Sequence, residues 1–307
     1  MKWPDGKKFA FTIFDDTDYQ TVENTAPVYE FLYQLGFRTT KSVWPIKGSQ
    51  KPLVGGGTCD DPEYLAWAQL LQRRGFEIGM HNATYHTSTK EETRRGMEVF
   101  KTHFGSYPKC LANHYCNEES IYWGNYRLTG AREFIHNLLL RYKRDGLFRG
   151  HIEDSPLFWG DICKEKVHYV RNFVYGDVNT LKACPYMPYY DPLRPYVNAW
   201  FAASEGGNLD SYLSMLSERN QDRLEIEGGA CIIYAHFAKG FFRDGKLDPR
   251  FKKLMERLSR KNGWFVPTDV LLDYLSCERG IHEITVPERA HLEWRWLLHK
   301  LRMRGSS

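Results

Sequence analysis

The chain has 307 residues, of which 42% are hydrophobic, so it is long enough to bury a full core as one large α/β domain. Its formal net charge of +4 comes from 42 basic and 38 acidic residues spread along the sequence, a pattern that does not indicate a nucleic-acid-binding protein. No apolar run is long enough to predict a membrane span, and the start of the sequence lacks the apolar core of a secretory signal. The seven cysteines contain no C-x-x-C pair, and we therefore expect reduced thiols in a cytoplasmic protein.

Short apolar runs alternate with helical stretches in the first part of the chain. The apolar runs predict strands at 9–14, 37–46, 76–80 and 108–114. Amphipathic stretches that end in glycine predict helices between them, at 26–36, 60–75 and 89–105. Repeated strand-then-helix units of this length imply a parallel sheet that is either open or closed into a barrel.

The sequence from 116 to 228 is less regular. It contains one predicted helix, at 132–146, and then a stretch crowded with Pro, Tyr and Trp that is typical of extended loops packed over a domain. The alternation resumes with strands at 228–237 and 264–268 and helices at 248–263 and 269–280. We therefore predict one α/β domain over residues 1–280, with 116–228 as an irregular insertion region within it.

Residues 281–307 form a C-terminal element. A helix is predicted at 287–304, with an apolar side and a basic side. Its basic residues are Arg289, Arg295, Lys300, Arg302 and Arg304. Such a helix packs on its own domain, packs on a second copy of the chain to form a homo-oligomer, or lies on a membrane surface. We favour packing on protein, because a basic amphipathic stretch is also typical of an ordinary protein surface.

Polar residues follow three of the predicted strands at the point where each strand ends. Asp15 and Asp16 close the first strand, and two adjacent carboxylates there need a cation to offset their charge. His81 and His86 follow the third strand, and His236 closes a later one. Because the carboxyl ends of parallel strands meet at one face, these residues are expected to share a site. Two neutral imidazoles and a carboxylate match the ligands of a catalytic divalent metal, so Asp16, His81 and His86 are predicted to bind a metal ion.

Three motifs resemble those of a known family, the polysaccharide deacetylases, also called NodB-homology or carbohydrate esterase family 4 proteins. FTIFDDTD resembles the family's T-F-D-D-G, HNATYH resembles its H-(S/T)-x-x-H, and YAHF resembles its L-x-H. The resemblance implies a single-domain, distorted (β/α)7-type barrel, to which the irregular insertion and the C-terminal helix are added. It also implies Asp15 as the catalytic base, Asp16, His81 and His86 as metal ligands, and His236 as the general acid. Zinc is the expected metal, with cobalt, nickel and iron as alternatives.

The sequence departs from the family pattern in ways that place it in a divergent branch. Four residues, rather than three, separate the two histidines of HNATYH. The family's R-x-P-Y-G motif is replaced by ANHYC, where Asn113, His114 and Tyr115 are predicted to contact the substrate or its oxyanion, and where His114 is an alternative metal ligand. His151 in RGHIED is a candidate for lining the pocket, and Asp161 in FWGD is a candidate for the family's Asp-Trp motif.

The function predicted from these residues is metal-dependent hydrolysis that removes an acetyl group from an N-acetylated, or O-acetylated, saccharide or saccharide precursor. In this mechanism the metal polarises the carbonyl, Asp15 takes a proton from the attacking water, and His236 protonates the leaving group. The expected partner is therefore an acetylated sugar or glycan precursor. Two alternatives are a glycosidase-like hydrolase that uses paired carboxylates on a related barrel, and a carbohydrate-binding protein that has lost the metal site.

Overall fold

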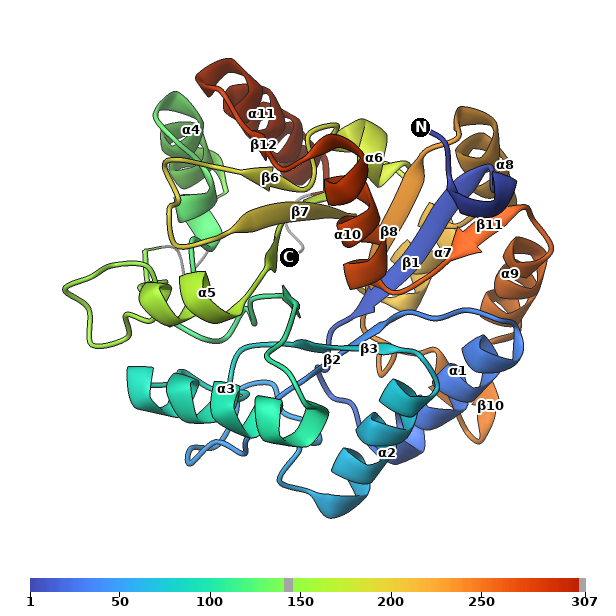
Figure 1. Ribbon diagram of the computed structural model, residues 1–307, viewed down its shortest axis with the longest axis horizontal. Coiled ribbons are helices and arrows are strands. Elements are labelled where there is room, and N and C mark those ends of the chain that lie inside the picture. Colours follow the sequence, from blue (N-terminus) through green and yellow to red (C-terminus); the bar gives the residue numbers. More distant parts are fainter. Residues whose placement is uncertain (141–145, 304–307) are drawn as a thin grey trace.

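Seven parallel strands form a closed barrel in the computed structural model, which describes residues 1–140 and 146–303. Around the barrel the order is β1, β2, β3, β4, β5, β7 and β8, and β8 pairs with β1 to complete the ring (Figure 1). The predicted distorted (β/α)7-type barrel is therefore confirmed. The strands are β1 (Phe9–Asp15), β2 (Thr40–Val43), β3 (Glu77–Met80), β4 (Cys110–Leu111), β5 (Tyr169–Tyr175), β7 (Ala199–Ser204) and β8 (Ala230–Ala235).

Three helices pack side by side on the outside of the first strands of the barrel (Figure 1). Thr21 and Thr89 begin two of them with capping boxes, and Asp61 caps the other just before Pro62. These caps fix where each loop from the carboxyl end of a strand passes into a helix. The helices are α1 (Val22–Gln34), α2 (Pro62–Arg73) and α3 (Lys90–Phe104), and a short turn, η1 (Pro4–Gly6), precedes β1.

The region 116–228, predicted as irregular, supplies two of the barrel strands, β5 and β7, in addition to its loops. Its helices span only 4 to 10 residues, which is too short to show a clear 3.6-residue period in the sequence. The helix predicted at 132–146 is observed as α4, which ends at Leu139, and residues 141–145 lie outside the described residues. The other elements are η2 (Gly124–Arg127), α4 (Ala131–Leu139), α5 (Gly160–Lys166), α6 (Thr180–Ala183), β6 (Tyr189–Tyr190), α7 (Leu209–Met215) and α8 (Glu218–Glu227).

The last part of the chain adds elements around the barrel. β11 extends the sheet beside the start of β1, and β12 pairs with β6. The predicted terminal helix is confirmed as α11, which packs against α4 and β5 with Trp296 and Leu297 buried; Arg304 lies outside the described residues. None of the described helices has the length and apolar character that crossing a membrane requires. The elements are β9 (Phe242–Arg243), β10 (Lys246–Leu247), α9 (Pro249–Ser259), β11 (Gly263–Phe265), α10 (Thr268–Arg279), β12 (His282–Glu283) and α11 (Val286–Met303).

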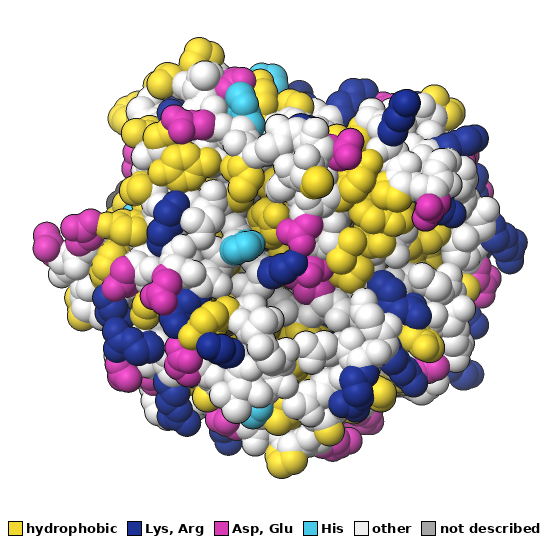
Figure 2. Space-filling model, viewed as in Figure 1, with side chains coloured by type: hydrophobic (Ala, Val, Ile, Leu, Met, Phe, Trp, Pro, Cys, Tyr) yellow, Lys and Arg dark blue, Asp and Glu magenta, His cyan; other side chains and the backbone are white. Residues whose placement is uncertain are grey.

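The surface mixes charges of both signs. On the face shown in Figure 2, Lys and Arg side chains are interspersed with Asp and Glu side chains. Among the described side chains visible there, no extended patch carries a single sign. This face therefore lacks the charge segregation that a polyanionic partner would favour.

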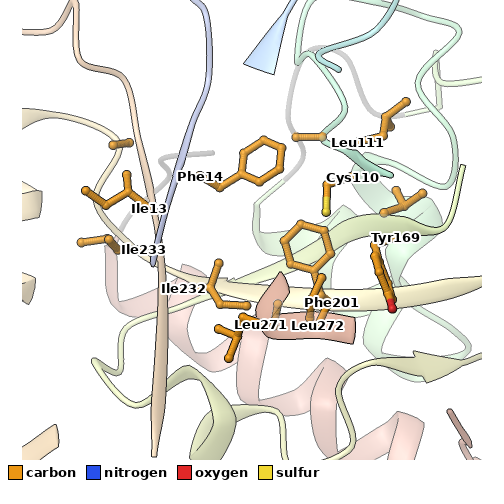
Figure 3. Close-up of a cluster of buried hydrophobic side chains, with 14 of the residues drawn as sticks. Ile13, Phe14, Cys110, Leu111, Tyr169, Phe201, Ile232, Ile233, Leu271 and Leu272 are labelled. Carbon is orange, nitrogen blue, oxygen red and sulfur yellow. The ribbon is translucent and has the colours of Figure 1, made fainter. Parts of the chain in front are cut away.

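Large apolar side chains fill the interior of the barrel (Figure 3). Phe14 of β1 packs against Phe201 of β7, with ring centroids 5.8 Å apart. Gly79 of β3 leaves room for this contact, because a Cβ there would lie 3.3 Å from the Phe14 ring. Successive strand residues point to opposite faces, so Asp16 points the same way as Phe14, toward the barrel axis, and Asp15 points away from it.

A buried carboxyl group joins the start of β3 to the start of α10. Glu77 accepts hydrogen bonds from the Thr40 hydroxyl (2.6 Å) and from the N–H of Asp269 (3.0 Å). Burial, and then the nearby Asp269 carboxyl group, raise the pKa of Glu77 above its ordinary value. Because the folded protein then binds this proton more tightly than the unfolded chain does, the free energy of unfolding falls as the pH rises from about 4.5 through the raised pKa.

Glu77→Gln is therefore expected to raise the free energy of unfolding above neutral pH and to make it less dependent on pH. The glutamine oxygen still accepts a hydrogen bond at this position, and no charge has to be buried. Each unit by which the pKa is raised corresponds to about 1.4 kcal/mol. Urea unfolding of both proteins at about pH 5 and about pH 9 measures the difference. If the free energy of unfolding fell equally in the two proteins between the lower and the higher pH, the expectation would be contradicted.

Candidate active site

The two adjacent acids at the end of β1 have different surroundings. Asp15 points toward α1 and the loop before it, and its carboxylate accepts hydrogen bonds from Gln20 Nε2 of the loop (2.8 Å to each oxygen) and from the Tyr29 hydroxyl of the helix (2.8 Å). A further donor is the Phe237 N–H, at 3.0 Å. Burial raises the pKa of Asp15 to about 6, although Lys41 and these donors oppose the rise. The Asp15 carboxylate thus forms its hydrogen bonds with the protein itself, on the side of β1 that faces away from the barrel axis.

Asp16 points into the barrel and lines a cavity at the carboxyl end of the strands. Its two oxygens pair with the guanidinium of Arg171 on β5, at 2.8 and 2.5 Å. Burial by itself raises the pKa of Asp16, but Arg171 outweighs burial and holds the pKa below its ordinary value. Asp16 also lies 4.0 Å from His81 Nδ1 and 4.0 Å from His236 Nε2. It is therefore an ionised carboxylate inside the cavity.

A third acid, Asp18, faces the same cavity because the loop after β1 turns back on itself. The Gln20 N–H bonds to the Thr17 carbonyl (3.1 Å), and Tyr19 within this turn has a left-handed backbone with φ of 59°. That conformation costs a residue with a side chain roughly 1–2 kcal/mol, so the rest of the fold holds the turn in place. The strained turn buries the Asp18 carboxylate among histidines.

Three histidine Nε2 atoms converge on the Asp18 carboxylate. His81 Nε2 lies 3.2 Å and His114 Nε2 lies 3.6 Å from Asp18 Oδ1. His236 Nε2 lies 3.2 Å, and Lys239 Nζ 3.9 Å, from Asp18 Oδ2. Burial raises the pKa of Asp18, but the imidazoles, His236 foremost, outweigh burial and hold the pKa well below its usual range.

The other ring nitrogen of each histidine faces an amide oxygen. The Nδ1 atoms of His81, His114 and His236 lie 2.9 Å from Ala112 O, Asn117 Oδ1 and Gly207 O, respectively. Because an amide oxygen only accepts, Nδ1 carries a proton in each ring, and this leaves Nε2 facing Asp18. A lone pair and a carboxylate repel each other unless a proton or a metal ion lies between them.

Asp18, His81 and His114 fit a metal ion. Their ligand atoms all lie within 4.8 Å of one another. Asp18 Oδ1 and His114 Nε2 are buried and have no hydrogen-bond partner in the described part of the chain. Burial lowers the pKa of His114 to about 4, so this imidazole is neutral at pH 7 and able to act as a ligand. One carboxylate and two imidazoles are ligands that suit zinc and related transition metals.

His86 lies outside this group. Its Nδ1 is 2.7 Å from the Thr87 carbonyl, and its ring packs against Tyr85 with centroids 5.8 Å apart. The extra residue between the two histidines of HNATYH thus belongs to a loop that carries the second imidazole away from the first.

The group of residues whose geometry fits a metal ion therefore differs from the ligand set predicted from the motifs. It contains Asp18 and His114, whereas Asp16 is engaged by its ion pair and His86 lies outside the group, so the predicted set stays a prediction. His81 is common to both sets. The signal for Asp18 was its position as the third acid of FDDTD, and His114 was already the alternative ligand.

The cavity is small, with a volume of about 50 Å³, which is room for only a few water molecules. Trp123, Val174 and Tyr234 give it an apolar wall beside the polar cluster. The residues that line it are Asp16, Asp18, His81, Asn113, His114, Tyr115, Trp123, Arg171, Val174, Tyr234 and His236.

No model of a known protein family matches the sequence, and no curated protein matches it. Solved structures do match. A "putative polysaccharide deacetylase" from Mycobacterium smegmatis has a TM-score of 0.50 and 11% identity, covering 93% of this chain and 96% of that one. Puue allantoinase also has a TM-score of 0.50 and 11% identity, covering 91% and 93%. The fold is that of the polysaccharide deacetylases. The low identity agrees with the predicted divergent branch.

Two further residues at the cavity of this deacetylase fold were predicted to contact substrate. Asn113 is held by the loop backbone: its Nδ2 donates to the Ile121 carbonyl (3.0 Å), and its Oδ1 accepts from the Ile121 N–H (2.8 Å). Tyr115 lies at the edge of the cavity and is 47% exposed. Their position is compatible with the predicted contacts, which stay predictions.

Two other predicted site residues lie elsewhere in the deacetylase fold. His151 packs against the Tyr122 ring (centroids 4.2 Å apart), accepts a hydrogen bond from the Tyr122 N–H (3.2 Å), and has its pKa lowered to about 4 by burial. Asp161 forms an exposed ion pair with Lys90 at 2.6 Å. Neither side chain is among those that line the cavity.

Proposed function

We propose that this protein is a metal-dependent hydrolase that removes an acetyl group from an N-acetylated saccharide or saccharide precursor. The observation that carries the proposal is the convergence of three imidazoles on Asp18, beside the ion pair of Asp16 and Arg171, in one cavity of the barrel. The deacetylase from Mycobacterium smegmatis that shares the fold supports the substrate class. A cytoplasmic location and the association of two copies through α11 stay predictions.

The proposed metal ligands are Asp18, His81 and His114, with zinc as the first candidate and cobalt, nickel and iron as alternatives. A divalent metal bound there would polarise the substrate carbonyl and lower the pKa of a bound water toward neutrality. The protein orients the ligand atoms through the hydrogen bonds made at Nδ1 of both histidines. The small cavity limits the water that can compete with the substrate.

Asp16 is the proposed proton acceptor, in place of Asp15, because it faces the cavity and Asp15 faces α1. Arg171 fixes the orientation of the Asp16 carboxylate and keeps it ionised. Each carboxylate oxygen retains a second lone pair, with which it can accept a proton from the attacking water. Asp16→Asn is therefore expected to keep the metal and to lower kcat by about 100-fold or more.

His236 is the proposed proton donor to the leaving group. Its Nδ1 is fixed by the Gly207 carbonyl (2.9 Å), and its Nε2 faces the cavity. An amine leaves only when it is protonated, whereas an alkoxide leaves more readily without a proton. His236→Asn is expected to lower kcat on N-acetyl substrates by about 100-fold to 10,000-fold and to have a smaller effect on O-acetyl esters. Equal losses on matched amide and ester substrates would contradict this role.

The test of the proposed function is acetate release from a panel of N-acetylated sugars, nucleotide-linked sugars and glycan precursors, with and without added zinc and a chelator. Allantoin is included because an allantoinase shares the fold, and aryl glycosides test the glycosidase alternative. We expect acetate release that the chelator abolishes and zinc restores. Folded, zinc-loaded protein that releases no acetate would overturn the proposal, and sugar binding without turnover would then favour the binding-protein alternative.

A further inference from the structure

A fully buried carboxylate, Glu119, lies behind the proposed metal site in the loop that follows β4. Its Oε1 accepts hydrogen bonds from Asn82 Nδ2 (2.8 Å) and Asn117 Nδ2 (2.7 Å). Its Oε2 accepts a hydrogen bond from the Ser88 N–H (3.0 Å). Burial raises the pKa of Glu119 to about 7 although these donors oppose the rise, and with three donors around it the carboxyl group is ionised at about pH 8.

This arrangement fixes which way the two asparagine amides face. A carboxylate only accepts hydrogen bonds, so Asn82 and Asn117 must each turn the NH2 group toward Glu119. Their oxygens consequently point toward one residue, His114. Asn117 Oδ1 lies 2.9 Å from His114 Nδ1, and Asn82 Oδ1 accepts from the His114 N–H at 2.8 Å.

Asn82 also connects the two histidines of the site, because it directly follows His81 in the chain. Its backbone is left-handed, with φ of 59°, a conformation that asparagine tolerates better than most residues. Glu119 is itself anchored, since its carbonyl accepts a hydrogen bond from Trp159 Nε1 at 2.6 Å. The amides are therefore held between a fixed acceptor on one side and His114 on the other.

We propose that Glu119 is a positioning residue that, through Asn117 and Asn82, holds His114 with its proton on Nδ1 and its Nε2 lone pair directed at the metal position. The inference rests on the metal site of the proposed function and adds to it the group that makes His114 a ligand. Reversal of the Asn117 amide would place NH2 against Nδ1 and move the ring proton to Nε2. A protonated Nε2 cannot bind a metal.

Glu119→Gln is the sharpest test, because it keeps the size of the side chain and replaces one acceptor by a donor. A glutamine NH2 would face either Ser88 N–H or the two asparagine amides, and both are donors in the present network. Asn117 retains one hydrogen bond to the Thr84 carbonyl (2.9 Å), so we expect the Asn117 amide to lose its fixed orientation only in part of the molecules. At about pH 8, zinc affinity should fall about 10-fold to 100-fold, the range typical of partners behind metal ligands.

The second readout uses metal-free protein. In ¹⁵N NMR spectra of histidine-labelled protein, His114 should show the Nδ1-protonated form in the wild type and an increased Nε2-protonated fraction in Glu119→Gln. Glu77→Gln is the matched control: Glu77 is also a buried carboxyl group with backbone and side-chain donors, but it lies at the opposite end of β3 from His81. This control should leave both zinc affinity and the His114 spectrum unchanged.

The outcomes separate this inference from the proposed function. If the wild type binds no zinc, the proposed function fails, while the metal-free spectra still test Glu119. If Glu119→Gln binds zinc as the wild type does, with an unchanged His114 spectrum, the inference is overturned. Should Glu119→Gln not fold, Asn117→Leu removes the acceptor at His114 Nδ1 directly, and retention of zinc affinity and of the wild-type form of His114 would equally overturn it.

Discussion

Replacing Asp18 with alanine is expected to abolish specific metal binding and, with it, hydrolysis. The Asp18 carboxylate is the point at which the Nε2 atoms of His81, His114 and His236 meet. Removal of a partner behind a metal ligand costs about 10-fold to 100-fold in affinity, so loss of a ligand should cost more than about 100-fold for zinc. Mass spectrometric metal analysis and competition with a chromogenic chelator measure this loss, and circular dichroism shows whether the variant is folded.

His86→Ala is the matched control for this experiment. His86 was a metal ligand in the set predicted from the motifs, and its ring lies outside the group formed by Asp18, His81 and His114. The His86 variant should therefore bind zinc with wild-type affinity. The opposite result, with zinc lost from His86→Ala and kept by Asp18→Ala, would show that the metal-bound protein uses the ligands predicted from the motifs.

Much of the fold could be predicted from the sequence, but the direction of single side chains could not. The runs at 9–14, 76–80 and 228–237 match the strands β1, β3 and β8 to within two residues at each end, and they end at the site, as expected. A strand in a closed barrel is buried on both faces, so its sequence is apolar throughout and shows no alternation. Nothing in FTIFDD therefore indicates which of the adjacent acids, Asp15 or Asp16, points toward the axis.

The two features of the site that the sequence did not reveal depend on contacts between distant segments. Arg171 lies on β5, in the region predicted as irregular, and its pairing with Asp16 joins residues 155 positions apart. Asp18 lies in a turn in which the next residue, Tyr19, adopts a left-handed backbone, a conformation that a residue with a bulky side chain rarely adopts. Local propensity gives no signal for either feature.

The proposed exchange of roles between Asp15 and Asp16 leads to the second large expected effect, which is on stability. Asp15→Ala is expected to lower the free energy of unfolding by about 3–5 kcal/mol, because it leaves a buried ammonium group without a nearby opposite charge and buried donors without an acceptor. Lys41, directly across from Asp15 on β2, is fully buried; its Nζ donates a hydrogen bond to the Ser42 carbonyl, and its charge interacts with the Asp15 carboxylate over a longer distance. The Tyr29 hydroxyl and the Phe237 N–H would lose an acceptor in the same step.

Urea unfolding of Asp15→Ala, Lys41→Met and the double variant separates the charge interaction between Asp15 and Lys41 from the other losses. The double variant should recover part of the stability lost by Asp15→Ala, because it leaves no unpaired charge in the interior. Asp161→Ala is the control, since its exposed pair with Lys90 should contribute less than about 1 kcal/mol. A stable Asp15→Ala protein that binds zinc but no longer turns over would show instead that Asp15 is the catalytic base. The hydrogen bonds from Gln20 and Tyr29 would then have to break before Asp15 could reach the substrate.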